Sequence, residues 1–388
     1  MTPDTLATTG VLCFGGEDWW YHNRGHCDMQ LMRCYARFAP VLYVNSVVMR
    51  KPNVREGAMF WRRVRRKLRS IRRGMVRVDD NFRVYSPLTA PVHHLPAART
   101  LNALALRTQM RLAIRRAGLR KPLVWVNCPA ASDTALALPR SALVYQRTDR
   151  YEDYPGVDRE QIARYDSRLK AAADLTFYSS RSLFEQERDA CRRAAYVEHG
   201  VDLERFTNAD REPHIPPELA DISHPIAGFF GGIDRHTFDL DLAAAVVERL
   251  PEVSFVFVGN ASVDCAPLAR HPHVHLIDQR PYEQIPHYGK CFDVCLMPWN
   301  QNEWIRACNP IKLKEYLALG KPVVSTPFPE LAHYDGLVRT ATTADEFACA
   351  IRAFLESPPA DLASRARARV AAHSWQAKAL QILDMLDT

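Results

Sequence analysis

Short hydrophobic runs alternate with longer amphipathic stretches along most of the chain. The runs are rich in β-branched and aromatic residues, which favours strands, and the stretches between them repeat apolar positions at helical spacing. In the first half we expect strands at Val11–Phe14, Val41–Val44, Phe82–Tyr85, Leu123–Val126, Ala142–Tyr145, Leu175–Tyr178 and Ala195–Val197. In the second half we expect strands at Ile226–Phe230, Ser254–Val258, Val274–Ile277, Val294–Met297, Val323–Ser325 and Leu337–Arg339, with helices near 238–250, 283–290, 310–319 and 344–355. This alternation predicts an α/β fold with parallel sheets covered by helices.

A segment rich in proline and polar residues, 207–225, separates the two sets of strands and is typical of a linker. The chain has 388 residues, which is too long for one ordinary domain. We therefore expect two doubly wound Rossmann-like domains, at residues 1–203 and 204–372. Such domains would face each other across a cleft at the carboxyl ends of their strands, where sheets of this kind bind ligands.

Residues 308–326, CNPIKLKEYLALGKPVVST, predict a helix that leads into a strand. Asn309 has the side chain of a good N-cap, and Pro310 suits the first helical position because no N–H partner is needed there. Gly320 suits the left-handed position that follows a helix, and Pro322 prevents the helix from continuing. The sequence therefore specifies both ends of this helix.

The start of the same helix is a candidate anion site. The free N–H groups and the positive end of the helix dipole suit an anion such as a diphosphate, and Lys312 adds a formal charge. Glu315, one turn later, could accept hydrogen bonds from ribose or sugar hydroxyls. The alternative is that Lys312 and Glu315 form an ordinary solvated pair, worth about 0.2–0.5 kcal/mol.

Two glycine pairs follow predicted strands and would allow a ligand to approach the backbone. Gly15 and Gly16 follow the first strand, but the third glycine of a dinucleotide fingerprint is missing, so a dehydrogenase is a weak interpretation. Gly231 and Gly232 end the first strand of the second half, and Arg235 follows them. This turn and its arginine would suit a diphosphate, although a Gly-Gly turn needs no ligand.

Asp149 follows the strand predicted at Ala142–Tyr145, at the end of the sheet where ligands bind. Its carboxylate could act as a general base on an acceptor hydroxyl if burial raised its pKa toward neutrality. The alternative is that Arg147 and Arg150 pair with it and keep it ionised. The sequence shows no Ser-His-Asp, P-loop or HExxH pattern, and no metal-binding cluster.

One segment makes the protein basic, since residues 50–77 contain twelve Lys or Arg and a single acid, Glu56, against a net charge of +7 for the whole chain. Within 57–75, apolar residues from Trp61 to Met75 recur at helical spacing, as in an amphipathic helix that lies on an anionic membrane. The residues of this predicted membrane surface are Trp61, Arg62, Arg63, Arg65, Arg66, Leu68, Arg69, Arg72 and Arg73. A packing helix with an arginine-rich outer face is the alternative. Nucleic acid is a weaker one, because no recognition motif accompanies the charge.

Targeting and cysteine patterns add little. No run approaches 18 apolar residues, and the N-terminus has neither the basic nor the apolar region of a signal peptide. The ten cysteines form no CxxC pair, so we expect reduced core residues in a cytoplasmic protein.

Several stretches resemble the bacterial GT-B-fold glycosyltransferases that assemble polysaccharides, similar to the teichuronic acid and xanthan glucuronosyltransferase types. The stretches are EHGVDLERF, GGIDRHTFDLDL, FVFVGN, RPYEQIPHYGKCFDVCLMPW and NPIKLKEYLALGKPVVST. The resemblance implies an acceptor domain at 1–203, a nucleotide-sugar domain at 204–372 and a final helix at 373–388 that crosses back to the first domain.

The resemblance also implies roles for residues of the second half. Lys312 matches the diphosphate-binding residue and Glu315 the carboxylate that holds the ribose, while Arg280 and Tyr282 match the edge of the base pocket. Neither a metal nor a cofactor is expected, because the nucleotide-sugar is a substrate and the helix N-terminus with basic side chains neutralises the diphosphate. Asp239 and Asp241 form a DxD, but they open a predicted helix, so we interpret them as helix-start residues.

Asp149 resembles the base of the xanthan-type inverting enzymes. Many retaining relatives carry a second Glu where this chain has Ala307, which weakens a retaining assignment. We therefore expect transfer from a UDP-sugar to a hydroxyl of a lipid-linked or polysaccharide acceptor in cell-surface glycan synthesis. The helix at 57–75 would hold the enzyme at the inner face of the membrane. The alternatives are a GT-B-fold nucleotide-sugar epimerase and a non-catalytic module that binds nucleotide-sugar or lipid.

Overall fold

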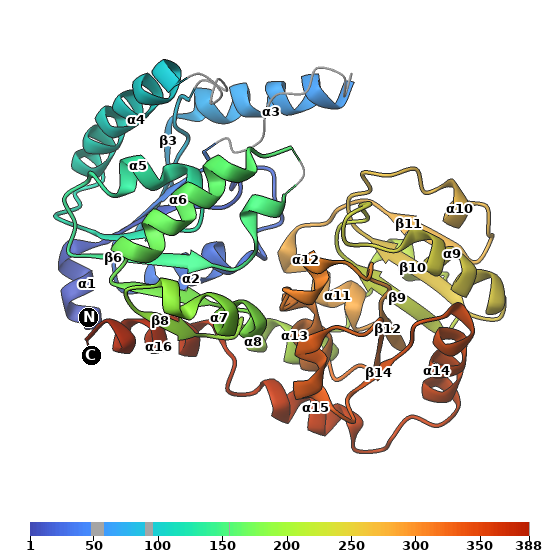
Figure 1. The fold of residues 1–388 in the computed structure, drawn as a ribbon. Helices are drawn as coiled ribbons and strands as arrows, with labels where there is room; N and C mark the ends of the chain where they lie inside the picture. The colour runs from blue at the N-terminus through green and yellow to red at the C-terminus, as the bar shows by residue number, and fades with distance from the viewer. Residues whose placement is uncertain (48–57, 90–95, 155, 388) are drawn as a thin grey trace. The chain divides into compact units, whose positions relative to one another are not determined.

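The computed structural model describes residues 1–47, 58–89, 96–154 and 156–387, and it divides into two compact units. Of residues 58–60, 63 and 96–99 it describes the backbone alone. The first unit contains Met1–Glu198 and Lys378–Thr388, and the second contains His199–Ala377 (Figure 1). The proline-rich segment 207–225 lies within the second unit.

Within the described residues, the first unit has an eight-stranded sheet in the order β3-β4-β2-β1-β5-β6-β7-β8. Its neighbouring strands are parallel, except that β3 runs antiparallel to β4. The strands are β1 (Val11–Phe14), β2 (Val41–Val44), β3 (Met75–Asp79), β4 (Phe82–Tyr85), β5 (Leu123–Val126), β6 (Ala142–Arg147), β7 (Leu175–Tyr178) and β8 (Ala194–Tyr196).

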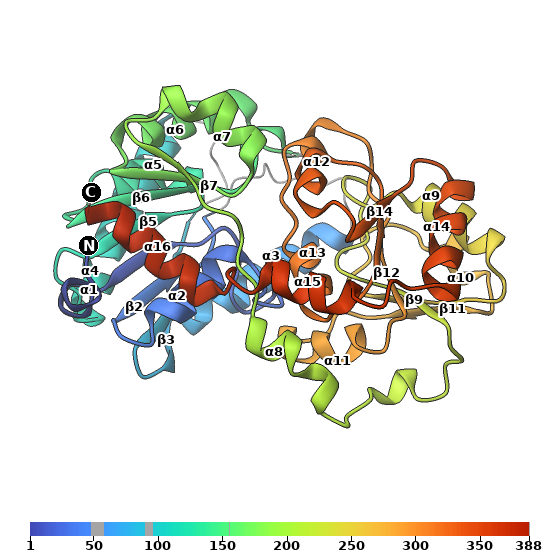
Figure 2. The same ribbon diagram turned by 90° about the horizontal axis from the view of Figure 1, so that it is seen from below.

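Helices cover both faces of this sheet. They are α1 (Pro3–Thr9), α2 (Cys27–Tyr35), α3 (Ala58–Arg73), α4 (Pro96–Arg116), α5 (Ser132–Ala135), α6 (Arg159–Ala172), α7 (Arg181–Glu187) and, from Lys378 onward, α16 (Trp375–Asp387). On one face, Leu12 and Phe14 pack with Met110 of α4 and Leu169 of α6. On the other, α16 lies beside α2 (Figure 2), where the Tyr35 hydroxyl donates to the Ala379 carbonyl over 3.0 Å.

The second unit has a parallel six-stranded sheet among its described residues, in the order β11-β10-β9-β12-β13-β14. Its strands are β9 (Ile226–Phe230), β10 (Ser254–Val258), β11 (Val274–Ile277), β12 (Val294–Met297), β13 (Val323–Ser325) and β14 (Val338–Thr340). Its helices are α8 (Leu203–Thr207), α9 (Leu240–Arg249), α10 (Ala266–Ala269), α11 (Ile285–Gly289), α12 (Glu303–Arg306), α13 (Ile311–Ala318), α14 (Ala344–Glu356) and α15 (Leu362–Val370). One face packs on α9 and α14, and on the other the Phe230 N–H donates to the Tyr316 hydroxyl of α13 over 3.1 Å.

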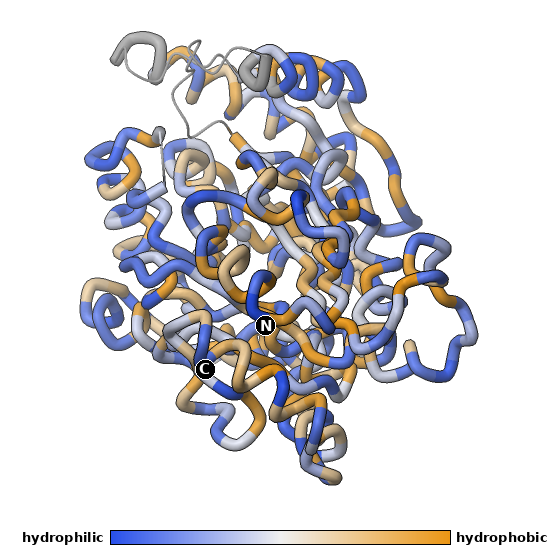
Figure 3. The backbone as a smooth tube through the Cα atoms, turned by 90° about the vertical axis from the view of Figure 1, so that its right-hand side faces the viewer, coloured by the Kyte–Doolittle hydropathy of each residue, from blue (hydrophilic) through white to orange (hydrophobic). Residues whose placement is uncertain are grey.

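The strand predictions are confirmed with boundaries that move by at most two residues, but β3 was missed. The prediction that Met75 continues the basic helix is wrong, because α3 ends at Arg73 and Gly74, at a φ of 60°, turns the chain into β3. β3 lacks the buried hydrophobic run that identified the other strands, since its last three residues are exposed. Figure 3 shows how hydrophobic (orange) and hydrophilic (blue) segments alternate along the backbone.

Each sheet has a point where the strand order reverses. In the first unit, β1 lies between β2 and β5, and in the second, β9 lies between β10 and β12. The loops after β1 and β5, and those after β9 and β12, therefore lead away in opposite directions, which opens a site for a ligand at the carboxyl ends. Both predicted glycine pairs follow these central strands.

No helix within the described ranges is both long and apolar enough to cross a membrane. All ten cysteines are free. Five are buried, but the expectation that all are core residues is wrong for Cys349, which is exposed on α14.

Candidate functional site

The turn after β9 begins with glycines, so its backbone has no side chains at the point where the strand order of the second sheet reverses. A Cβ atom on Gly231 would lie 2.3 Å from the Lys312 Nζ, and one on Gly259, after β10, would lie 1.8 Å from the Gly231 carbonyl oxygen. Gly232 has room for a side chain, since the nearest atom to its Cβ position is 3.7 Å away. The close approach is therefore at Gly231 and not at the predicted Gly232.

Lys312 extends from the first turn of α13 toward this glycine turn. Its Nζ lies 4.0 Å from the centre of the Phe229 ring and 5.5 Å from that of Trp299. Burial lowers the pKa of Lys312 to about 8, although Glu315 and Asp234 act in the opposite direction. Within the described part of the chain, this ammonium makes neither an ion pair nor a hydrogen bond. The site thus holds a positive charge that no described carboxylate contacts as an ion pair.

Glu315 lies one helical turn further along α13 and is only 5% exposed. Burial raises its pKa to about 7, against the opposing effects of the Tyr282 hydroxyl and Lys312. Tyr282 is buried, and its hydroxyl has no hydrogen bond of normal geometry to the described residues, although it lies near the carboxylate. The alternative of a solvated Lys312–Glu315 pair is wrong, because Glu315 is in the interior.

The start of α13 differs from the prediction. Pro310 is the N-cap, with φ −76° and ψ 126°, and the helix begins at Ile311. The prediction that Asn309 caps the helix is wrong, because its amide oxygen accepts from Lys314 Nζ over 3.2 Å. No side chain caps the first-turn N–H groups within the described structure, which leaves them available to a ligand. The C-terminal prediction is confirmed, since Gly320 has a φ of 75°.

Residues that the sequence reading missed complete this site. Asp202 caps α8 and accepts from the Arg205 Nε over 2.9 Å, and Asp202 also raises the pKa of Glu315. Asp234 shapes the turn after the glycines, since it accepts from the Thr237 N–H over 2.9 Å and the Thr237 hydroxyl over 2.7 Å. Asp202 and Arg205 lie in the EHGVDLERF stretch. This stretch resembles the GT-B glycosyltransferases, so it could have identified both residues as part of the site.

The two predicted arginines have different positions. Arg235 is exposed in the turn that follows the glycines, and its carbonyl accepts from Asn300 Nδ2 over 3.0 Å. Arg280 donates to Glu218 Oε1 over 2.6 Å and to the Tyr288 hydroxyl over 3.0 Å. A ligand would compete with existing partners for Arg280, whereas Arg235 is open to one.

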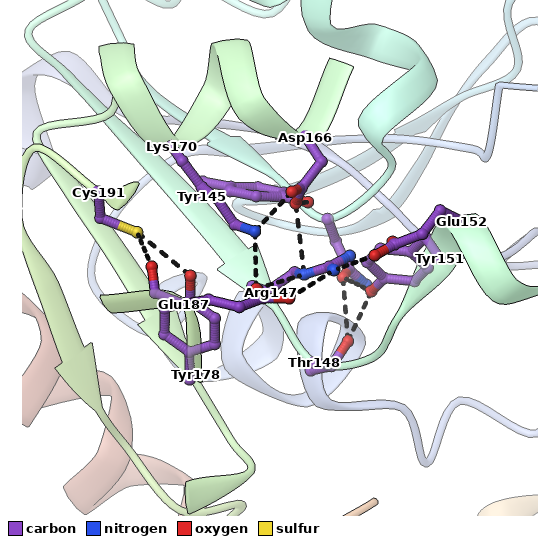
Figure 4. Close-up of polar contacts among 11 residues, drawn as sticks. Tyr145, Arg147, Thr148, Tyr151, Glu152, Asp166, Lys170, Tyr178, Glu187 and Cys191 are labelled. Carbon is purple, nitrogen blue, oxygen red and sulfur yellow. Dashed lines mark hydrogen bonds and ion pairs between the residues drawn. The ribbon is translucent and has the colours of Figure 1, made fainter. Parts of the chain in front are cut away.

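Asp149 lies in the loop that follows β6, beyond the carboxyl end of the strand next to β5 in the first sheet. It is half-buried, and burial raises its pKa to about 6 against the opposing effects of Arg147 and the Thr148 hydroxyl. The alternative that neighbouring arginines pair with Asp149 is wrong. Arg147 pairs with other carboxylates (Figure 4), and Arg150 donates to the Gln186 amide oxygen.

Side chains of neighbouring residues pack closely against Gly15 and Gly16, which leaves no room for a Cβ atom at either position. A Cβ atom on Gly15 would lie 2.0 Å from the Tyr43 hydroxyl, and one on Gly16 would lie 2.6 Å from Asn127 Nδ2. The Gly16 N–H donates to Asp28 Oδ2 over 2.9 Å, and the same oxygen accepts from the Tyr43 hydroxyl over 2.9 Å. In this structure neighbouring side chains fill the space beside the turn.

The described residues contain no group of three His, Cys, Asp or Glu side chains arranged as metal ligands. Of the DxD pair, Asp239 caps α9 by accepting from the Leu242 N–H over 2.9 Å. The interpretation of this pair as the start of a helix is therefore confirmed.

α3 packs through polar groups and exposes apolar ones. Lys67 Nζ donates to the Ser46 carbonyl over 2.9 Å, and the Ser70 hydroxyl donates to Asp18 Oδ2 over 2.7 Å. Trp61 is 65% exposed and Leu68 is 56% exposed. Exposed cationic side chains accompany them, namely Arg62, Arg65, Arg66, Arg69, Arg72 and Arg73, while the side chain of Arg63 lies outside the described residues.

Comparisons with known proteins bear on the fold and on part of the second unit. Residues 224–357 match the family described as glycosyl transferases group 1. Over 137 residues the chain is 33% identical to the protein of Bacillus subtilis (strain 168) named teichuronic acid biosynthesis glycosyltransferase TuaH, and the match spans 34% of each protein. The comparison thus extends over about a third of that relative's length.

Two solved structures resemble the chain over nearly its whole length. Sucrose-phosphate synthase from Thermosynechococcus elongatus has a TM-score of 0.70 at 15% identity, covering 97% of this chain and 98% of that one. Anabaena Alr3699/HepE, solved in complex with UDP and glucose, has a TM-score of 0.69 at 15% identity, covering 98% and 100%. The predicted GT-B fold is therefore confirmed, and the match to the glycosyl transferases group 1 family falls on the part of the second unit that contains Gly231, Lys312 and Glu315.

Proposed function

We propose that the chain transfers a sugar from a UDP-sugar to a hydroxyl of a lipid-linked or polysaccharide acceptor. The observation that carries this proposal is the position of the Lys312 ammonium. It lies beside the Gly231 turn at the start of α13, one helical turn from the buried Glu315. The complex of the Anabaena relative with UDP and glucose supports a uridine nucleotide as donor, and the name of the Bacillus relative supports a cell-surface glycan as product.

The diphosphate of the donor would occupy the space beside Lys312. Its oxygens would accept from the uncapped N–H groups of α13 and from the ammonium, which is protonated at neutral pH because its pKa is about 8. Negative charge grows on the leaving diphosphate during transfer, and donors already aimed at it lower the barrier. Glu315 would accept hydrogen bonds from the ribose hydroxyls. A bound diphosphate would form an ion pair with the Lys312 ammonium.

Asp149 would remove the proton from the acceptor hydroxyl. A carboxylate with a pKa of about 6 is mostly ionised at neutral pH and is a stronger base than an ordinary aspartate. The acceptor oxygen forms a bond to the anomeric carbon, the bond from that carbon to the diphosphate oxygen breaks, and the proton passes to the Asp149 carboxylate. A single displacement of this kind inverts the anomeric configuration.

The exposed surface of α3 supports contact with an anionic membrane. α3 and α4 contain no Asp or Glu, and both end in a pair of arginines. α4 exposes Leu101 by 67% and Leu104 by 51%, in addition to Trp61 and Leu68 on α3. Arginines beside exposed aromatic and aliphatic residues fit a bilayer surface, where the headgroups are anionic and the acyl region is apolar. The acceptor is therefore proposed to be presented at the membrane.

The donor site predicts selective stabilisation by a nucleoside diphosphate. In a thermal-shift panel of UDP, GDP, ADP and TDP, we expect UDP at about a hundred times its Kd to stabilise the chain by about 2.7 kcal/mol, a shift of a few degrees. Lys312→Ala should abolish the shift. The matched control is Lys321→Ala, which removes a lysine just beyond the other end of α13 and should leave the shift intact. Equal shifts in all three proteins would contradict the donor site.

The base assignment predicts the pH profile of turnover. In the wild type, kcat/KM should rise with pH through about 6 and then level, because Asp149 must be ionised to accept a proton. Asp149→Asn should lower kcat by about 10²–10⁴-fold while the UDP-induced thermal shift persists. Undiminished turnover by Asp149→Asn would remove this residue as the base. Formation of an epimerised donor without any acceptor would instead indicate an epimerase.

The membrane surface predicts charge-dependent binding to vesicles. Replacing Arg62, Arg65, Arg66, Arg69, Arg72 and Arg73 with Gln should weaken sedimentation with phosphatidylserine vesicles at least about a hundredfold, since each residue near the surface contributes roughly 1 kcal/mol. The control replaces six exposed arginines of the first unit outside α3 and α4, namely Arg159, Arg164, Arg168, Arg181, Arg188 and Arg192. It lowers the net charge equally and should bind normally. Equal loss in both variants would show that only net charge matters.

A further inference from the structure

We infer that the ion pair between Arg147 and Glu152 closes the loop that carries Asp149, and that these two residues position Asp149 for proton transfer. The inference rests on the proposed function, since Asp149 is the proposed base. Arg147 and Glu152 act through Asp149 and are not themselves placed against a substrate.

The loop from 147 to 152 is closed by three nested contacts. Arg147 Nη2 donates to Glu152 Oε1 over 2.9 Å at its ends. Inside this pair, the hydroxyls of Thr148 and Tyr151 lie 2.5 Å apart, and the Tyr151 N–H donates to the Asp149 carbonyl over 3.0 Å. Asp149 lies at the centre of these contacts, so they restrict the positions that its carboxylate can reach.

Arg147 is in turn fixed by two helices of the first unit (Figure 4). Its Nε and Nη2 donate to the carboxylate of Glu187, the last residue of α7, over 3.2 and 3.1 Å. Its Nε also lies 3.3 Å from Asp166 Oδ1 on α6. Lys170 joins these two carboxylates, with Nζ 2.5 Å from Asp166 and 2.7 Å from Glu187. The guanidinium therefore connects the loop to α6 and α7, and the loop is held in place relative to these two helices.

The other side of the loop is fixed as well. The Tyr151 hydroxyl donates to Asn127 Oδ1 over 2.5 Å, and Asn127 directly follows β5. The Arg147 guanidinium lies over the Tyr151 ring, with its carbon 5.9 Å from the ring centre. The loop is therefore held between the end of β5 on one side and α6 and α7 on the other.

Stability alone does not explain this buried ionic cluster. Arg147 has no exposed side-chain surface, and Asp166 and Lys170 are each 7% exposed. Removing such charges from water costs free energy, and well-packed apolar residues of similar volume are often equally stable. Burial opposes ionisation of Glu187, yet Arg147 and Lys170 lower its pKa to about 2. The Glu187 carboxylate therefore stays ionised, and it keeps the ion pairs that hold the Arg147 side chain in place.

The cluster also sets the charge beside Asp149. Arg147 and Tyr151 interact electrostatically with Asp149 in the described structure, and Arg150 is its neighbour in the sequence. Because Arg147 is shared among Glu152, Asp166 and Glu187, its charge is already compensated and only partly offsets the effect of burial on Asp149. Neutralising Glu152 would leave more of that positive charge to act on Asp149.

The test is a double-mutant cycle between Glu152 and Asp149 in the full-length protein, measured as turnover of UDP-sugar. Glu152→Ala should lower kcat by about tenfold to a hundredfold and leave the affinity for UDP unchanged, because only the position of the base is disturbed. In the Asp149→Asn background, the same change should alter the residual rate by less than about twofold, because its target is already gone. The matched control is Asp153→Ala, since Asp153 is the next residue and pairs with Arg159 over 3.1 Å.

A conservative variant keeps the test informative if Glu152→Ala does not fold. Glu152→Gln retains an oxygen that can accept from Arg147, so it should retain most of kcat, but the acid limb of its kcat/KM profile should shift to lower pH. An equal loss on Glu152→Ala in both backgrounds, or an unshifted limb in Glu152→Gln, would overturn the inference and leave Asp149 as the base. Full turnover by Asp149→Asn would overturn the base assignment and this inference together.

Discussion

The proposed donor site depends on a half-buried ammonium, that of Lys312, which forms no ion pair with the residues that the structure describes. Lys312 is held between two aromatic rings and a glycine turn, and burial makes it easier to deprotonate than an ordinary lysine. Such an arrangement is unfavourable for the protein alone, because a desolvated charge is costly without a partner. A bound diphosphate would remove that cost. Gly231 suits this turn because its φ of 148° is rarely adopted by residues with a side chain, and the Lys312 Nζ lies 2.3 Å from the position that a Cβ would take.

Each sheet has polar residues beyond the carboxyl ends of its strands. In the second unit, Lys312 and Glu315 lie on α13, which comes after β12 beside the reversal of strand order, and in the first unit Asp149 follows β6, one strand beyond β5. The sites differ in how charge is balanced. In the second unit, Lys312 forms no ion pair with a described residue. In the first, two cations and three carboxylates pair with one another, so Arg147 is neutralised without Asp149. These differences fit the binding of an anionic donor and the removal of a proton, respectively.

The sequence predicted much of the fold because buried parallel strands appear as continuous hydrophobic runs. β3 was missed because it is largely exposed, and Asn309 was given the wrong role because the extended conformation of Pro310 already begins the helix. Lys312 and Glu315 could be selected since both lie on one helix with recognisable ends. The support of Asp149 could not be predicted, because Glu187 is forty positions from Arg147 and the contact requires the folded sheet.

The most direct test of the central claim is the pH dependence of UDP affinity, measured by calorimetry from about pH 7 to about pH 9 in the wild type and in Lys312→Arg. The wild-type Kd should rise above about pH 8 and approach a tenfold increase per pH unit, because deprotonated Lys312 must regain its proton to hold the diphosphate. An arginine stays charged throughout this range, and both proteins share the ionisation of the ligand, so the Kd of Lys312→Arg should remain nearly constant. The same pH dependence in both proteins would contradict the role of Lys312.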